Sequence, residues 1–178
     1  MTTTEQPTFT STERTDLVEM LAKHRHFLRF TTAGITDEQA RQRTTVSELT
    51  LGGLIKHVTE VEQSWADFIV NGPAENSDPS NMTEDDFAKW ADNFRLLPNE
   101  TLAGVLAAYA EVANRTDELV ATLPDLNATQ PLPAAPWFEP GARWSARRVL
   151  MHIIAETAQH SGHADIIRES LDGQKSMG

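Results

Sequence analysis

The chain has 178 residues, 39% hydrophobic and 23% charged, so we expect one ordinary globular domain. Its formal net charge of −11 argues against nucleic acid and anionic membrane surfaces as partners, because both attract a basic face. It contains no cysteine, which excludes disulfides, thiolate metal sites and thiol nucleophiles, so any metal must be held by His, Asp or Glu.

Residues 1–10 are polar and rich in threonine, and we expect them to form a disordered tail. They lack the basic and apolar regions of a signal peptide, and no apolar run approaches the ~18 residues that span a bilayer. We therefore expect a cytoplasmic protein, without a membrane span, whose folded domain covers residues 11–178.

Apolar residues recur with helical spacing in four long segments, which cover residues 11–33, 47–71, 98–123 and 145–171. Residues 36–39 can start a short helical turn, and residues 83–93 begin with a capping motif and predict a short helix.

Residues 124–143 contain five of the nine prolines and show little periodicity, which predicts an extended connection. No segment alternates polar and apolar residues as a half-buried strand does. Together these features predict an all-α fold: a four-helix bundle with one short extra helix and a long proline-rich loop before the last helix.

The last helix carries four metal-capable side chains, His152, Glu156, His160 and His163, with spacings that place them on one face. With His152 at 0°, Glu156 lies near 40°, His160 near 80° and His163 near 20°, while the apolar residues cluster at about 60–120°. Glu156 and His160 should therefore point closest to the bundle interior, and His152 and His163 should lie at the edge of the apolar stripe.

His57 occupies a similar border position on the second long helix. A bundle that joins these helices would bring together two imidazoles and a carboxylate, which suit zinc with one position open. The spacing leaves a structural role open, because a lone histidine at a core edge usually only packs and a Glu–His pair often lies on a helix surface.

Two further groups precede or open the last helix. Arg143, Arg147 and Arg148 form a small basic cluster, for which ion pairs are the default and an anionic ligand the alternative. Trp144, with the aromatic pair at 137–138, could line a pocket mouth or simply cover the end of the bundle.

Two segments resemble the DinB superfamily: LGGLIKHV at residues 51–58 and WSARRVLMHIIAETAQHSGHADIIRE at residues 144–169. More closely, the chain resembles the mycothiol S-transferase branch, which is related to mycothiol-dependent maleylpyruvate isomerases. The likeness covers nearly the whole chain after about residue 11 and implies a DinB-like four-helix bundle that binds a divalent metal.

The usual ligands of that superfamily are one His from the second helix and a His-x3-His pair from the last helix. Here Glu156 occupies the first position of the pair, as in the maleylpyruvate isomerase relatives. The resemblance therefore implies His57, Glu156 and His160 as ligands. His152, His163 and Arg168, together with Arg143 and Trp144, are candidates for supporting the ligands or contacting substrate.

The resemblance implies a zinc-dependent transferase that conjugates a low-molecular-weight thiol, most simply mycothiol, to electrophilic small molecules in detoxification. Another divalent metal would suit the same ligands. A mycothiol-dependent isomerase and a non-catalytic metal- or ligand-binding bundle are the alternatives. We also expect a homodimer that buries the aromatic residues of the short helix, Phe87, Trp90 and Phe94.

Overall fold

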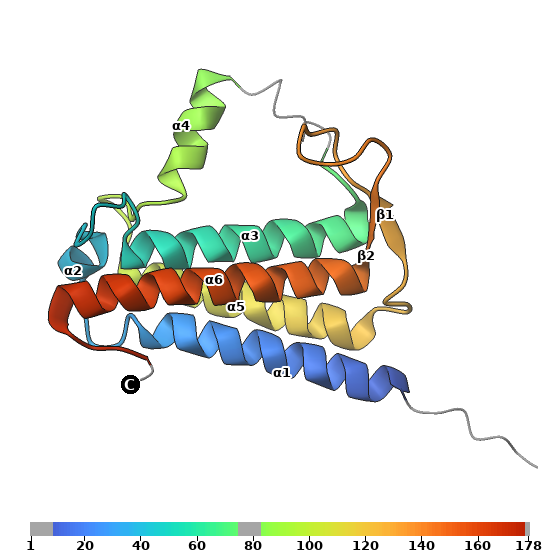
Figure 1. Cartoon of the computed structure of the whole chain (residues 1–178), viewed down its shortest axis with the longest axis horizontal. Coiled ribbons are helices and arrows are strands. Elements are labelled where there is room, and N and C mark those ends of the chain that lie inside the picture. Colours follow the sequence, from blue (N-terminus) through green and yellow to red (C-terminus); the bar gives the residue numbers. More distant parts are fainter. Residues whose placement is uncertain (1–8, 75–82, 177–178) are drawn as a thin grey trace, which may run out of the picture.

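The computed structural model describes residues 9–74 and 83–176, and four long helices dominate this part of the chain (Figure 1). They are α1 (Phe9–Phe30), α3 (Leu51–Asn71), α5 (Leu102–Thr122) and α6 (Ala146–Asp172). The shorter elements are α2 (Asp37–Arg41), α4 (Glu84–Asp92), β1 (Thr129–Pro131) and β2 (Arg143–Ser145). The all-α, DinB-like four-helix bundle is confirmed.

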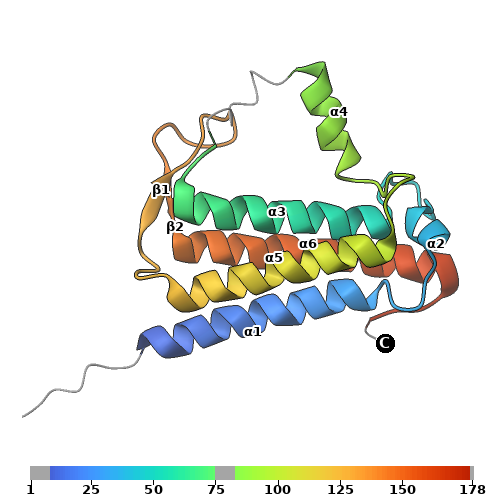
Figure 2. The same ribbon diagram turned by 180° about the vertical axis from the view of Figure 1, so that it is seen from behind.

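The long helices form a closed ring of neighbours. α6 packs between α1 and α3, α5 packs against α3, and α1 also contacts α5. α3 and α6 lie side by side and run in opposite directions, while α5 and α1 form the other side of the bundle (Figures 1 and 2). Because the two helices are antiparallel, moving two turns forward along α3 corresponds to moving two turns backward along α6.

Capping side chains set the helix starts. Thr50 accepts a hydrogen bond from the backbone N–H of Gly53, and Ser145 caps α6 as predicted. The expected starts near residues 47 and 98 fall too early, because Thr50 and Thr101 are the residues whose side chains bond the first turns of α3 and α5. α3 ends at Gly72 and α6 at Gly173, both with positive φ, as the sequence predicted.

The connection before α6 contains a small sheet that the sequence did not predict. Thr129–Pro131 and Arg143–Ser145 pair as two antiparallel strands. Strands of three residues are too short to show an alternating pattern in the sequence. The predicted turn at residues 36–39 also forms a helix, α2, so there are two short helices within the described residues rather than one.

The N-terminal tail was expected to end at residue 10, but α1 already begins at Phe9. The rest of that tail, residues 1–8, lies outside the described residues. Among the helices that the structure describes, none combines the length and apolarity needed to cross a membrane.

A charged network lies inside the bundle, which the sequence did not predict. Glu62 of α3 is fully buried and receives two hydrogen bonds from Arg25 of α1, with a closest N–O distance of 2.5 Å. Arg25 also pairs with Asp117 of α5 at 2.8 Å. One guanidinium therefore ties three of the four long helices together.

Candidate metal centre

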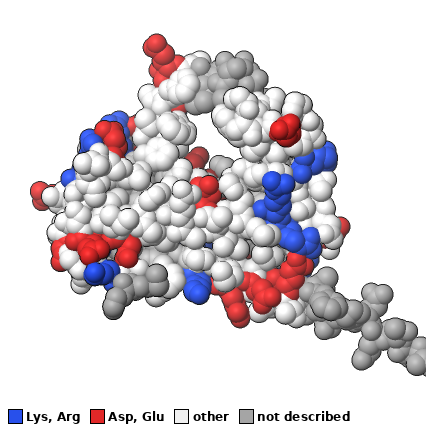
Figure 3. Space-filling view, in the orientation of Figure 1, with Lys and Arg blue, Asp and Glu red and all other residues white. Residues whose placement is uncertain are grey.

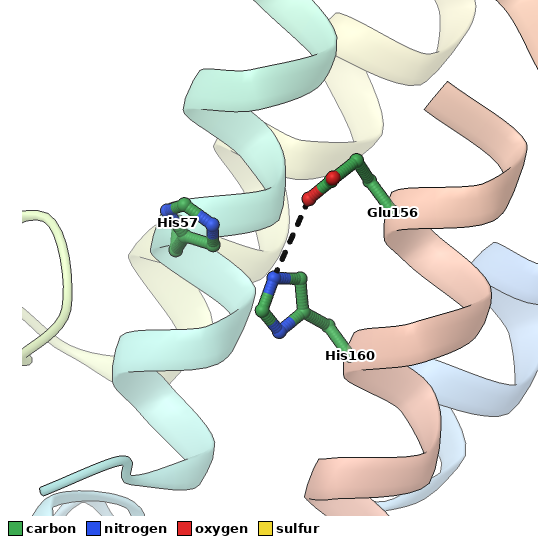
Figure 4. Close-up of side chains that lie close together, drawn as sticks. All are labelled: His57, Glu156 and His160. Carbon is green, nitrogen blue, oxygen red and sulfur yellow. Dashed lines mark ion pairs between the residues drawn. The ribbon is translucent and has the colours of Figure 1, made fainter. Parts of the chain in front are cut away.

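The side chains of His57, Glu156 and His160 converge between α3 and α6 (Figure 4). One ligand atom from each lies within 4.8 Å of the other two. The Nε2 atom of His160 is 3.6 Å from a carboxylate oxygen of Glu156, and the rings of His57 and His160 meet edge to face at 4.8 Å between centroids. The antiparallel helices thus bring together Glu156 and His160, whose helical angles pointed inward, and His57 from the border of the apolar stripe on α3.

Partial burial keeps both imidazoles neutral at pH 7. The pKa of His57 is lowered to about 4, chiefly by burial and also by nearby His160, although the Glu156 carboxylate opposes both effects. Burial also lowers the pKa of His160, again against the influence of Glu156. A neutral imidazole has a free nitrogen lone pair, which a metal ligand requires.

Glu156 lies between two histidines of its own helix. Its carboxylate is 3.6 Å from His160 on one side and 3.9 Å from Nε2 of His152 on the other. In the described part of the chain, no Lys or Arg forms an ion pair with it. A half-buried carboxylate beside two neutral imidazoles lacks a compensating positive charge, and a divalent cation at this point would supply one.

His163 contacts His160 from behind. The two Nδ1 atoms are 3.4 Å apart, so the Nε2 atom of His160 is the one that faces Glu156. Metal-binding histidines usually make such a hydrogen bond through their second ring nitrogen, which fixes the tautomer and the orientation of the ring.

Phe94 covers His57, and the sequence analysis did not assign it to the site. Its ring stacks on the imidazole at 4.3 Å, and Trp90 of α4 meets Phe94 edge to face at 4.9 Å. This close approach depends on Gly53, one turn before His57, because a Cβ at Gly53 would overlap the carbonyl of Phe94. The glycine pair at 52–53 is the sequence signal that could have indicated this contact.

An aromatic cluster adjoins the other end of the site. Trp65 of α3 stacks on Trp144 of β2 at 5.0 Å, and both rings meet His152 edge to face at 4.9 and 5.2 Å. Arg148 covers Trp144, with its guanidinium carbon 4.5 Å from the ring centroid. Trp144 therefore packs beside the three-residue cluster rather than only over the bundle end.

Comparison with known families decides the identity. The sequence profile of the mycothiol-S-transferase family matches residues 16–173, which include all three convergent side chains. The chain belongs to the mycothiol-S-transferase family. Membership supports a transferase with a mycothiol-related thiol as cosubstrate.

Solved structures show the same fold at low sequence identity. A conserved protein from Enterococcus faecalis superimposes with a TM-score of 0.62 and 15% identity, covering 89% of this mycothiol-S-transferase family member and 96% of the other chain. At this identity the likeness concerns the fold alone. No curated protein matches the chain significantly.

In this mycothiol-S-transferase family member, two of the candidate arginines form hydrogen bonds to residues outside the three-residue cluster. Arg143 bonds Thr129 on the partner strand. Arg168 is buried and donates to the carbonyls of Thr31 and Ala33 at the end of α1. Arg147, from the expected basic cluster, pairs with Glu13 of α1, which is the role predicted by default.

Proposed function

We propose that this chain is a zinc-dependent transferase that conjugates mycothiol to electrophilic small molecules in detoxification. His57, Glu156 and His160 would hold the ion. The convergence of two neutral imidazoles and one carboxylate from facing helices, in a member of this family, carries the proposal. Three protein ligands leave a zinc ion with an open position, as catalytic zinc sites require.

The zinc ion would lower the pKa of a bound thiol below its ordinary value of about 8.5, so that thiolate is available at neutral pH. The thiol must come from the cosubstrate, because the chain has no cysteine. In the transfer, the thiol loses its proton, the sulfur electron pair forms the new carbon–sulfur bond, and the leaving group departs with its bonding pair.

The chain's own side chains hold and shield this reaction. His163 orients His160, and Phe94 covers the outer face of His57. Trp65 and Trp144 pack against His152 on the other side. We place the reaction in the cytoplasm, where thiols are kept reduced.

The test is conjugation of mycothiol to iodoacetamide by purified protein before and after chelation. We expect chelation to abolish the catalysed rate and added zinc to restore it. The reactivated protein should contain one zinc ion per chain. A catalysed rate that survives complete removal of metal would contradict metal dependence.

A thiol-dependent isomerase is the second candidate, because Glu156 stands at the ligand position where the isomerase relatives also carry Glu. Mass spectrometry separates the two activities. A transferase releases a stable thiol conjugate, whereas an isomerase returns the thiol unchanged and leaves the mass of the substrate unaltered.

A further inference from the structure

A cavity of about 550 Å³ lies where the C-terminal end of α3 meets the proline-rich connection. Its walls include Trp65, Phe68, Pro73, Ala74 and Pro133. This volume is within the usual range of small-molecule sites. Figure 3 shows the surface of the protein hollowed between α4 and the connection, and this cavity lies on the side of the connection.

Trp65 joins this cavity to the candidate metal centre. Its ring lines the cavity and also meets His152 at 4.9 Å, and His152 lies 3.9 Å from Glu156. Trp65 follows His57 by about two helical turns, or ~12 Å along α3. A molecule with one end in the cavity must therefore extend about 12 Å along α3 to place its other end beside Glu156.

The charge of the cavity lining indicates whether an anionic or an uncharged ligand would bind there. Asp67 is the one charged residue among the described residues that line the cavity, and none of them is Lys or Arg. The nearby Arg148 is engaged on the face of Trp144. An anionic ligand would meet a carboxylate without a compensating cation, whereas an uncharged apolar ligand would gain contacts with Trp65, Phe68 and the prolines.

We propose that this cavity holds the uncharged, apolar body of the electrophile, an aromatic or similarly bulky group, and directs its reactive carbon toward Glu156 and His160. The inference rests on the proposed transferase function and names its substrate class. In this proposal Trp65 has two roles: it forms part of the cavity wall, and its ring contacts His152.

Binding can be tested without turnover, using full-length metal-loaded protein and naphthylmethanol, an uncharged aromatic probe without an electrophilic carbon. Quenching of tryptophan fluorescence reports the probe, because Trp65 lines the cavity and stacks on Trp144. We expect the anionic analogue naphthoate to bind about tenfold more weakly, and Asp67→Asn to reduce this difference.

A matched pair of substitutions locates the probe. Ala74→Phe fills the cavity and should weaken naphthylmethanol binding about tenfold, whereas Ala134→Phe in the adjoining connection lines a different hollow and should change it less than about twofold. Circular dichroism checks that both variants fold. Equal affinities in all three proteins, loss of binding only in Ala134→Phe, or equal binding of naphthoate would overturn the inference.

Conjugation of mycothiol to 4-(bromomethyl)biphenyl, an elongated uncharged electrophile, separates this inference from the function on which it rests. We expect Ala74→Phe to raise the KM for this electrophile about tenfold. An unchanged KM in an active enzyme would overturn the cavity assignment and leave the transferase function standing. Probe binding that Ala74→Phe weakens, in a protein without any conjugation, would overturn the transferase function and retain the apolar site.

Discussion

Glu156 has a histidine one turn before it and another one turn after it on α6, at 3.9 and 3.6 Å. The two neighbours are not equivalent. His160 turns toward His57 on α3 and has His163 behind it, whereas His152 packs between Trp65 and Trp144. The geometry therefore predicts different consequences when each histidine is removed.

His160→Ala should abolish zinc binding and thiol transfer while the bundle stays folded, because the apolar faces of α6 still pack. His152→Ala should reduce the rate about tenfold, as expected for a residue that only positions Glu156. Metal analysis, conjugation rates and circular dichroism of the two variants measure the difference. Equal small effects would mean that the metal is bound elsewhere or is not used.

Metal-free protein should lose stability as the pH falls from about 6.5 to about 4. The pKa of His57 is near 4 in the folded state and about 6.5 in the unfolded chain, so between these values the unfolded chain binds more protons. Above about pH 6.5 both states carry neutral His57 and its contribution to the slope vanishes.

Urea unfolding of chelated protein at several pH values measures this slope, and His57→Asn is the comparison because it cannot titrate. We expect the variant to show a smaller loss of stability on acidification, with His24, His152 and His160 contributing to the residual loss because burial also lowers their pKa values. An identical slope in both proteins would contradict the assignment.

At the scale of elements, α4 has no buried residue of its own, yet the turn after it places Phe94 on His57. The start of α3 permits this, since Gly53 leaves room for the backbone at Phe94. The position of this turn therefore depends on the absence of a Cβ at Gly53 in α3.

Gly53→Ala should push the Phe94 backbone away from α3, uncover His57 and weaken zinc binding. Gly162→Ala is the control, because Gly162 lies in α6 between His160 and His163 with nothing near its added Cβ. The control should keep zinc affinity and gain up to about 1 kcal/mol of stability. Zinc titration and urea unfolding of both variants distinguish the two effects, and unaltered zinc affinity in Gly53→Ala would count against the role of Phe94.

Periodicity and capping residues were enough to predict the long helices, and helical angles alone favoured Glu156 and His160 over His152 and His163. The contacts that the sequence could not predict depend on distant segments. Phe94 reaches His57 through a turn outside both helices, and the three-residue strands carry no pattern. Nothing near Glu62 in the sequence indicates its partner Arg25, which lies on another helix.

At the scale of the whole molecule, Arg25 connects α1, α3 and α5 through Glu62 and Asp117. Removal of one partner from a buried ion pair leaves an uncompensated charge. Glu62→Ala should therefore destabilise the protein by about 3–5 kcal/mol.

Glu48→Ala is a suitable control, because Glu48 pairs with Arg43 at the surface and should contribute less than about 1 kcal/mol. Urea unfolding of the two variants in zinc-containing buffer measures both values. Similar small losses would show that the buried network does not hold the three helices together.

Assembly remains a prediction from the exposed aromatic residues of α4. Phe87 and Trp90 are 55% and 56% exposed, which favours burial against a second copy. Phe94, expected in the same interface, instead packs within the chain on His57. Light scattering at micromolar concentration should give the mass of a dimer, and Trp90→Lys should shift it to that of a monomer. A monomeric wild-type protein would contradict the prediction.

The ion pair between Arg25 and Glu62 affects how rigidly the proposed metal site is held. Arg25 attaches α3 to α1 and α5, and α3 packs against α6, so the fold itself positions His57 relative to Glu156 and His160. A zinc finger, by contrast, uses most of its binding free energy to fold the chain. In the proposed metal site that free energy would instead be available to discriminate between ions by size and preferred geometry, so the rigidity of the bundle would help to determine which metal binds.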